Sequence, residues 1–203
     1  MDTLIKRQQP DLPEAMTAVV NLLVVGSVDT SAATIESTIS LVRDGTATIV
    51  LDPGMVGDRR QILEPLEALG VDLNNVTDIV FSHHHPDHTL NAALFPNARV
   101  HDHWAVYHRN TFTRRPAEGT LITPSVRLIA TPGHSSEDIT SLVGTSEGVY
   151  AFTHAWWHEA GPPVDPLADM DQLHLSRARV LQVAARVVPG HGKAFTPSAD
   201  TPR

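Results

Sequence analysis

The chain has 203 residues, of which 41% are hydrophobic and 19% charged, as is typical of one compact globular domain. Its 15 basic residues against 23 acidic ones give a formal charge of −8, which disfavours a general nucleic-acid binder. The absence of cysteine excludes disulfides, thiolate metal ligands and thiol nucleophiles. No stretch approaches about 20 consecutive apolar residues, so no membrane span is predicted. Residues 1–7 lack the apolar core of a secretion signal, so we expect a cytoplasmic protein.

The first half of the chain is predicted to be mostly β-structure. Residues 18–25 are expected to form a strand, and residues 38–43 and 47–51 a hairpin joined at Asp44-Gly45. Apolar residues at helical spacing predict a helix over residues 59–69 that ends at Gly70. The short apolar run at residues 79–81 indicates a buried strand.

A segment dense in metal-binding side chains follows that strand directly. Because side chains alternate along a strand, His83 and His85 should leave its end on the same side. Pro86 turns the chain, which should bring Asp87 and His88 back towards the same place. An incidental surface tract is a poorer explanation, because the segment lies mid-chain between an apolar run and a helix-like one. Imidazoles and carboxylates this close together are what zinc prefers, so the segment predicts a metal site.

The second half of the chain alternates strands with helices. After a strand at residues 98–101, we expect a short helix at residues 104–110 and an irregular loop at residues 111–123. Later strands are expected at residues 126–130, 139–143, 149–153 and 186–188. A long amphipathic helix is expected at residues 169–185. Such a succession suggests two sheets packed face to face, with helices on the outside.

Four segments resemble, in the same order, the motifs of the metallo-β-lactamase superfamily. They are the strand and turn at residues 49–54, the His-x-His-x-Asp-His run at residues 83–88, the Thr-Pro-Gly-His-Ser run at residues 131–135, and the Pro-Gly-His-Gly run at residues 189–192. The stretch from Trp156-Trp157 to Pro166 most resembles the small branch of that family named after metallo-β-lactamase domain-containing protein 1. The resemblance covers about residues 18–193, nearly the whole chain.

This resemblance implies an α/β (α+β) fold, a four-layer αββα sandwich, with residues 1–203 as a single domain whose core is about residues 18–193. It also implies two neighbouring metal sites, the first formed by His83, His85 and His134 and the second by Asp87, His88 and His191. Asp52 is expected to orient one of the metal-binding histidines. Zinc is the expected ion, tightly bound in the first site, with iron and manganese as alternatives.

The sequence departs from the family at the residues after the predicted strand 149–153. Where the family has a Gly-Asp pair that supplies a metal-bridging carboxylate, this chain has His154-Ala155. Alanine cannot bind a metal, so we expect the second ion to be weakly held or missing. His154 could bind one ion as a neutral donor, hydrogen-bond the attacking nucleophile, or simply cap the strand. Without a second ion, Asp87 is the natural general base, so Asp87 and His154 are the candidate catalytic residues.

These features predict a metal-dependent hydrolase, because zinc lowers the pKa of bound water to about 7 and so supplies a hydroxide nucleophile. The acidic charge favours a small-molecule ester, thioester or lactone as substrate. One alternative is a phosphodiesterase or ribonuclease, for which Arg109, Arg114 and Arg115 would be the basic patch. Another is a non-hydrolytic protein with one metal in a biosynthetic pathway. A homodimer is a further possibility, and Trp156 and Trp157 could line the site or pack in the core.

Overall fold

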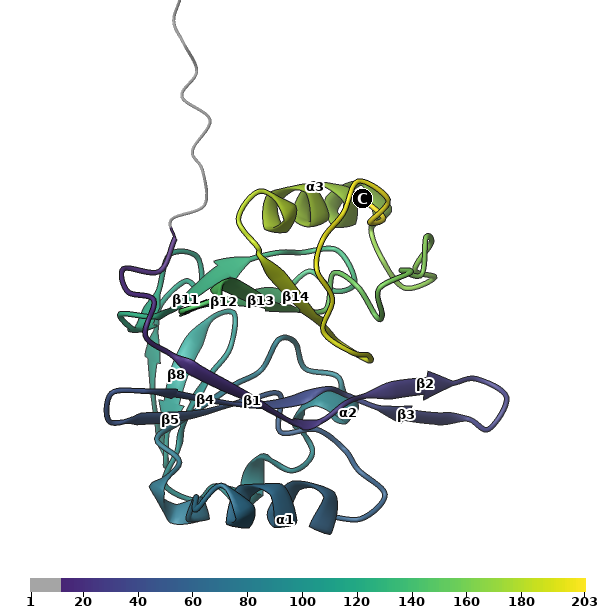
Figure 1. Ribbon diagram of the computed structural model, residues 1–203. Helices are drawn as coiled ribbons and strands as arrows, with labels where there is room; N and C mark the ends of the chain where they lie inside the picture. Colours follow the sequence, from purple (N-terminus) through teal and green to yellow (C-terminus); the bar gives the residue numbers. More distant parts are fainter. Residues whose placement is uncertain (1–11) are drawn as a thin grey trace, which may run out of the picture.

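The computed structural model describes residues 12–203, whose helices and strands form four layers (Figure 1). Helix α3 (Met170–Leu181) covers one sheet, helix α1 (Arg60–Ala68) covers the other, and the two sheets face each other between them (Figure 1). This arrangement is the αββα sandwich expected from the sequence, and the α/β fold class is confirmed.

The first sheet has seven strands whose spatial order follows the chain. They are β1 (Val19–Val24), β4 (Ile39–Asp44), β5 (Ala47–Leu51), β6 (Asp78–Val80), β7 (Arg99–His101), β8 (Ala105–His108) and β9 (Thr111–Arg114). β6 runs parallel to both β5 and β7, whereas the other neighbours are antiparallel. Gly45 has a φ of 58° in the β4–β5 turn, a conformation that glycine adopts without steric cost.

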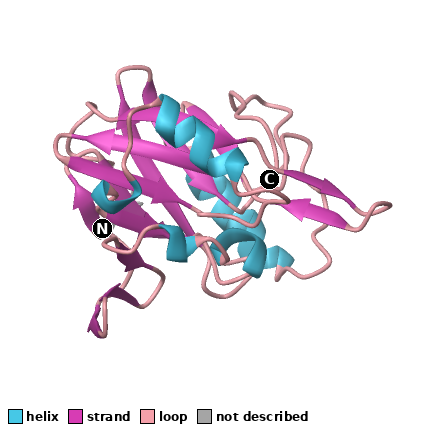
Figure 2. Cartoon of the chain, turned by 90° about the horizontal axis from the view of Figure 1, so that it is seen from below, coloured by secondary structure: helices cyan, strands magenta, loops and turns pink. Residues whose placement is uncertain are grey.

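The second sheet has five strands, also in chain order. They are β10 (Leu121–Thr123), β11 (Val126–Ala130), β12 (Ile139–Thr145), β13 (Gly148–Thr153) and β14 (Arg186–Pro189). β14 is parallel to β13, and α3 provides the crossover between them. A separate two-stranded ribbon, β2 (Ser27–Asp29) and β3 (Thr34–Glu36), projects from the body in both views (Figures 1 and 2). The remaining helical elements are α2 (Pro86–Thr89) and the 3₁₀ turns Leu73–Asn75 and Ala92–Leu94.

The hydrophobic core fills all three spaces between the layers. Val80 packs between the sheets with Leu128 and Val188, whereas its neighbour Ile79 faces α1 and packs with Ile62. Both faces of β6 are therefore buried, which explains why Ile79 and Val80 are apolar in succession rather than alternating with polar residues. The third space, between the second sheet and α3, is filled by residues that include Trp156, Leu173 and Val180. Burial on both sides fixes the end of β6, from which the histidine-rich segment starts.

The structure corrects the prediction for residues 104–123. The expected helix at residues 104–110 is instead strand β8, and the expected loop at residues 111–123 contains β9 and β10. β8 and β9 form a hairpin in which His108 pairs with Thr111 and Arg109 has a φ of 57°. Only the first residue of β8 is buried and every residue of β9 is exposed, so this edge hairpin has no apolar periodicity that distinguishes a strand from a helix.

Among residues 12–203, no helix is both long enough and apolar enough to cross a membrane.

Candidate metal centre

The candidate side chains come from the ends of strands in both sheets. Those from the first sheet follow β6 in the turn to α2 or lie on α2, and they are His83, His85, Asp87 and His88. Those from the second sheet follow β11, β13 and β14, and they are His134, His154 and His191. Segments more than a hundred residues apart are thus brought together where the two sheets meet.

His83, His85 and His134 form a first triad. One ligand atom from each lies within 4.8 Å of the other two. The Nε2 atoms of His83 and His134 lie 2.9 and 3.0 Å from Nδ1 of His85. His83 and His134 are buried, whereas His85 is exposed and marks the open side of the centre. The grouping is the one that the resemblance implied for the first metal site.

Asp87, His88 and His191 form a second triad, which meets the same 4.8 Å criterion. Oδ2 of Asp87 lies 3.3 Å from Nε2 of His88 and 3.6 Å from Nε2 of His191. His83 links the two triads, because its ring centroid is 4.3 Å from that of His88. The two predicted sites are therefore direct neighbours.

Three of the histidines are held at Nδ1 by a carboxylate or backbone carbonyl oxygen, which leaves Nε2 facing the centre. The pairs are His88 with Oδ2 of Asp52 at 2.8 Å, His134 with Oδ2 of Asp165 at 2.7 Å, and His191 with the carbonyl oxygen of Glu36 at 2.9 Å. A carbonyl only accepts, so Nδ1 of His191 must donate and its Nε2 carries the lone pair in the neutral ring. Such outer contacts are what metal-binding histidines normally have.

The donor set fits a divalent metal such as zinc or iron. Nε2 of His88 is buried and has no hydrogen-bond partner among residues 12–203. Two nitrogens bound to one tetrahedral zinc ion at about 2.0–2.1 Å lie about 3.3 Å apart, close to the spacings in the first triad. Converging lone pairs at these distances repel one another unless a cation lies between them.

Burial and mutual repulsion keep most of these rings neutral. Burial lowers the pKa of His83 and His154 well below the ordinary value, and the neighbouring histidines lower it further. Burial also lowers the pKa of His191 to about 4. His88 differs, because Asp52 and Asp87 together outweigh the effect of burial and raise its pKa to about 9. Neutral imidazole is the form that binds metal, so His83, His154 and His191 are already in that form near neutral pH.

The two neighbouring tryptophans have different surroundings. Trp156 is fully buried in the core, and its Nε1 donates to the carbonyl oxygen of Pro202. Trp157 lies beside the centre, with ring centroids 6.1 Å from His134 and 6.0 Å from His191. Only the second tryptophan therefore borders the metal centre.

The structure brings together the side chains that the sequence predicted for the centre and adds outer contacts that were not predicted. Asp52 contacts a centre histidine as expected, and all seven predicted inner residues lie together. The carboxylate of Asp165 and the hydroxyl of Ser82, 3.0 Å from Nδ1 of His83, were not predicted. Asp165 lies in the irregular loop between β13 and α3, eight residues after Trp157, and no sequence signal marked it.

The chain was compared with known proteins. The sequence model of the "Metallo-beta-lactamase superfamily" matches residues 34–192. Metallo-beta-lactamase domain-containing protein 1 from Xenopus laevis is 29% identical over 160 residues, which cover 74% of this chain and 69% of the relative. The protein of the same name from Rattus norvegicus is 32% identical over 162 residues, covering 72% of this chain and 62% of the relative. The resemblance to this branch of the family is confirmed.

Solved structures share the fold at low sequence identity. A Thermotoga maritima protein described as a metallo-beta-lactamase has a TM-score of 0.73 at 21% identity, covering 89% of this chain and all of its own. An N-acyl homoserine lactone hydrolase with its product bound at the catalytic metal centre has a TM-score of 0.63 at 17% identity, covering 86% and 92%. A protein solved in a di-iron-bound form has a TM-score of 0.63 at 21% identity, covering 85% and 94%. These structures agree in fold with the family model, whose match over residues 34–192 shows that the chain belongs to the metallo-β-lactamase superfamily.

Proposed function

We propose that the protein hydrolyses a small ester, thioester or lactone with the help of one or two divalent metal ions. The observation that carries this proposal is the first triad, in which three imidazoles converge and one side stays open at His85. Three protein ligands with an open position are the mark of a catalytic zinc site, whereas structural sites are closed by four. The lactone hydrolase of the same fold binds its product at such a metal centre, which supports this substrate class.

The ligands of the first ion are His83, His85 and His134, and those of the second are Asp87, His88 and His191. A bound divalent ion supplies a nucleophile from water at neutral pH and stabilises negative charge on a substrate oxygen. Zinc is our proposal for the tighter ion, because neutral imidazoles suit it, and iron is the alternative to test.

Side chains of the protein orient these groups and accept the proton released during the reaction. Hydrogen bonds from Nδ1 of His134 to Asp165 and from Nδ1 of His88 to Asp52 fix which ring nitrogen faces the centre. Burial alone would raise the pKa of Asp87, but the neighbouring His88 and His191 together outweigh burial and leave this pKa below its ordinary value. Asp87 is therefore ionised at neutral pH, and where no second ion is bound it can accept a proton from the attacking water and return it to the leaving group. Trp157 forms one wall beside the reacting atoms.

The phosphodiesterase alternative finds less support in the chain. Nη1 of Arg115 donates to the carbonyl oxygen of Asp102, and its Nη2 lies 3.3 Å from Nδ1 of His101. Only Arg109 and Arg114 of the predicted basic trio are thus exposed on the hairpin. Together with the net charge of −8, this favours a small substrate over a polyanion. The cytoplasmic location, the single domain over residues 1–203 and the homodimer stay predictions.

The proposal is tested by metal content and turnover of purified protein. We expect at least one zinc or iron equivalent per chain and chelator-sensitive hydrolysis of a phenyl ester, a thioester and an acyl homoserine lactone. His85→Ala removes one of three ligands and should abolish both metal retention and turnover. His174→Ala, which alters an exposed histidine on α3, is the matched control and should leave both unchanged.

Three other results would contradict the proposal. Turnover that survives complete metal removal would exclude the metal mechanism. Faster hydrolysis of a bis-aryl phosphodiester than of any ester or lactone would favour the phosphodiesterase. One tightly bound ion with no hydrolysis in any of these assays would favour the non-hydrolytic alternative.

A further inference from the structure

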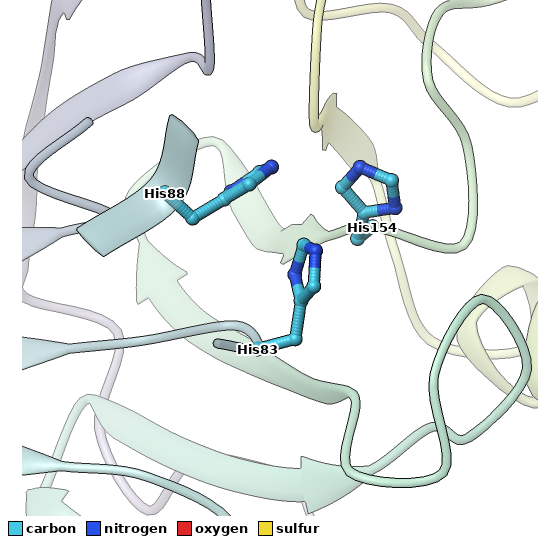
Figure 3. A group of neighbouring side chains, drawn as sticks. All are labelled: His83, His88 and His154. Carbon is cyan, nitrogen blue, oxygen red and sulfur yellow. The ribbon is translucent and has the colours of Figure 1, made fainter. Parts of the chain in front are cut away.

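His154 lies in the middle of the metal centre. Its side chain is 2% exposed and follows β13 directly. Its ring centroid lies 4.6 Å from that of His83, 4.9 Å from His88, 4.1 Å from His134 and 5.1 Å from His191. Figure 3 shows His83, His88 and His154 reaching one space from three different segments. The ring therefore lies between the two triads rather than at the edge of the strand.

Both ring nitrogens of His154 have the surroundings of a metal donor. Its Nε2 lies 3.1 Å from Nε2 of His191, which already carries a lone pair because Nδ1 donates to Glu36. Its Nδ1 is buried and has no hydrogen-bond partner in the described part of the chain. One ligand atom of His154 also lies within 4.8 Å of those of His83 and His88, as a third triad. A cation bound at one ring nitrogen of His154 would take up its lone pair and separate it from the neighbouring imidazole nitrogens.

The backbone leaves room for this ring. A Cβ at Gly190 would lie 2.5 Å from Cδ2 and 2.9 Å from Nε2 of His154, far inside van der Waals contact. Gly190 does not have a positive φ, so a residue with a side chain could adopt its backbone conformation. The missing side chain at position 190 is therefore explained by space for the imidazole.

The neighbouring Ala155 faces the opposite way. It is 2% exposed and belongs to the core group that contains Trp156 and Leu173, and its carbonyl oxygen accepts from Nε of Arg177 at 2.7 Å. Position 154, not position 155, thus provides the inward side chain. The sequence-based expectation assigned the missing carboxylate to Ala155, whereas the residue that takes the inward position is His154.

We propose that His154 is a seventh metal ligand, which binds one ion as a neutral imidazole between the two triads. The inference rests on the proposed metal-dependent function. A neutral imidazole has one free lone pair, so it cannot bridge two ions as a carboxylate does. Asp87 is then the single carboxylate among these seven donors, and the positive charge of two ions is less compensated. One of the two ions is accordingly held more weakly.

The test compares metal binding by four variants and the unmodified protein. Chelator-treated protein is titrated with zinc by calorimetry, metal equivalents are counted by elemental analysis, and the cobalt form is followed by visible absorption. His154→Ala should lose one ion or weaken its binding at least tenfold, with a changed cobalt spectrum. Gly190→Ala keeps the imidazole but displaces it, so it should weaken the same ion. His154→Asp should tighten that ion at least tenfold, and His174→Ala should match the unmodified protein.

The inference is overturned if His154→Ala binds as many ions, with the same affinity and cobalt spectrum, as His174→Ala. Should His154→Ala fail to fold, as judged by circular dichroism, His154→Asp decides, because a carboxylate away from the metal would leave zinc affinity unchanged. Failure of the proposed function has a different signature, in which the unmodified protein binds no metal or hydrolyses nothing. If turnover is metal-dependent but replacing His154 leaves metal binding unchanged, this inference is rejected and the proposed function stands.

Discussion

The histidine–oxygen pairs decide which nitrogen each ring presents to the metal centre. A neutral imidazole carries one N–H and one lone pair, and a hydrogen-bond acceptor beside Nδ1 holds the N–H there. The acceptors differ in kind: carboxylates serve His88 and His134, and a backbone carbonyl serves His191. A carboxylate can be changed by mutation without moving the backbone, so its effect on metal affinity can be measured.

We predict that Asp165→Asn weakens zinc binding by about tenfold or more. The change is isosteric, but it removes the anion that polarises the His134 ring, and losing such an outer partner costs 10–100-fold in other metal sites. Zinc affinity is measured by competition with a coloured chelator. Asp171→Asn, an equal charge change at an exposed position on α3, is the control. Equal affinities of the two variants would show that Asp165 does not support the ligand.

At the scale of single residues, the sequence predicted the grouping of those side chains that are close to one another along the chain. His83, His85, Asp87 and His88 share one six-residue run, so their convergence follows from strand alternation and a turn. Asp165 is 31 residues from His134 in an irregular loop, and nothing in its local sequence marks it as a hydrogen-bond partner. The direction of the His154 side chain could also not be predicted from the sequence, because it depends on which face of the sheet the residue after β13 points to.

The elements whose residues are buried on both faces were predicted well, and the β8–β9 hairpin was not. β5 and β6 contain the short apolar runs Ile49-Val50-Leu51 and Ile79-Val80, as expected of buried strands, and α1 ends before Gly70, which has a φ of 68°. In the hairpin, every residue of β9 is exposed, so no hydrophobic pattern identifies the strand. Its stability depends on cross-strand pairing and on the turn, neither of which leaves a strong pattern in the sequence.

That turn provides a prediction about stability. Arg109 has a φ of 57° at the first of the two residues that join β8 to β9, a position where such turns prefer glycine. We expect Arg109→Gly to stabilise the protein by roughly 0.5–1 kcal/mol, because it relieves the left-handed strain of a non-glycine residue. Urea unfolding midpoints give the change. Arg114→Gly, which removes the same charge within β9 where no positive φ occurs, should destabilise the protein instead. Equal shifts would mean that charge, not backbone strain, controls the turn.

Across the whole molecule, the metal centre joins the two sheets. Ligands from the turn after β6 belong to the first sheet, and His134, His154 and His191 follow strands of the second. Direct backbone links between the sheets also occur here, as between the amide of Thr38 and the carbonyl oxygen of Gly190 at 2.7 Å. An ion held from both sides therefore opposes separation of the layers as well as local fraying.

We predict that metal binding stabilises the entire fold and not only the loops that hold the ligands. A ligand that binds only the folded state adds RT ln(1 + [L]/Kd), about 2.7 kcal/mol at a hundredfold excess over Kd. Such a gain in a chain of this size should raise Tm by roughly 5–10 °C. Calorimetric scans of zinc-loaded and chelator-treated protein measure the shift, and amide exchange locates it.

Because the ligands come from both sheets, slower exchange should extend to β5 and β6 and equally to β12 and β13. Protection confined to α2 would contradict a link between the layers. His174→Ala should show the full shift, and His85→Ala should show little of it, which separates binding at the centre from zinc bound elsewhere on the surface.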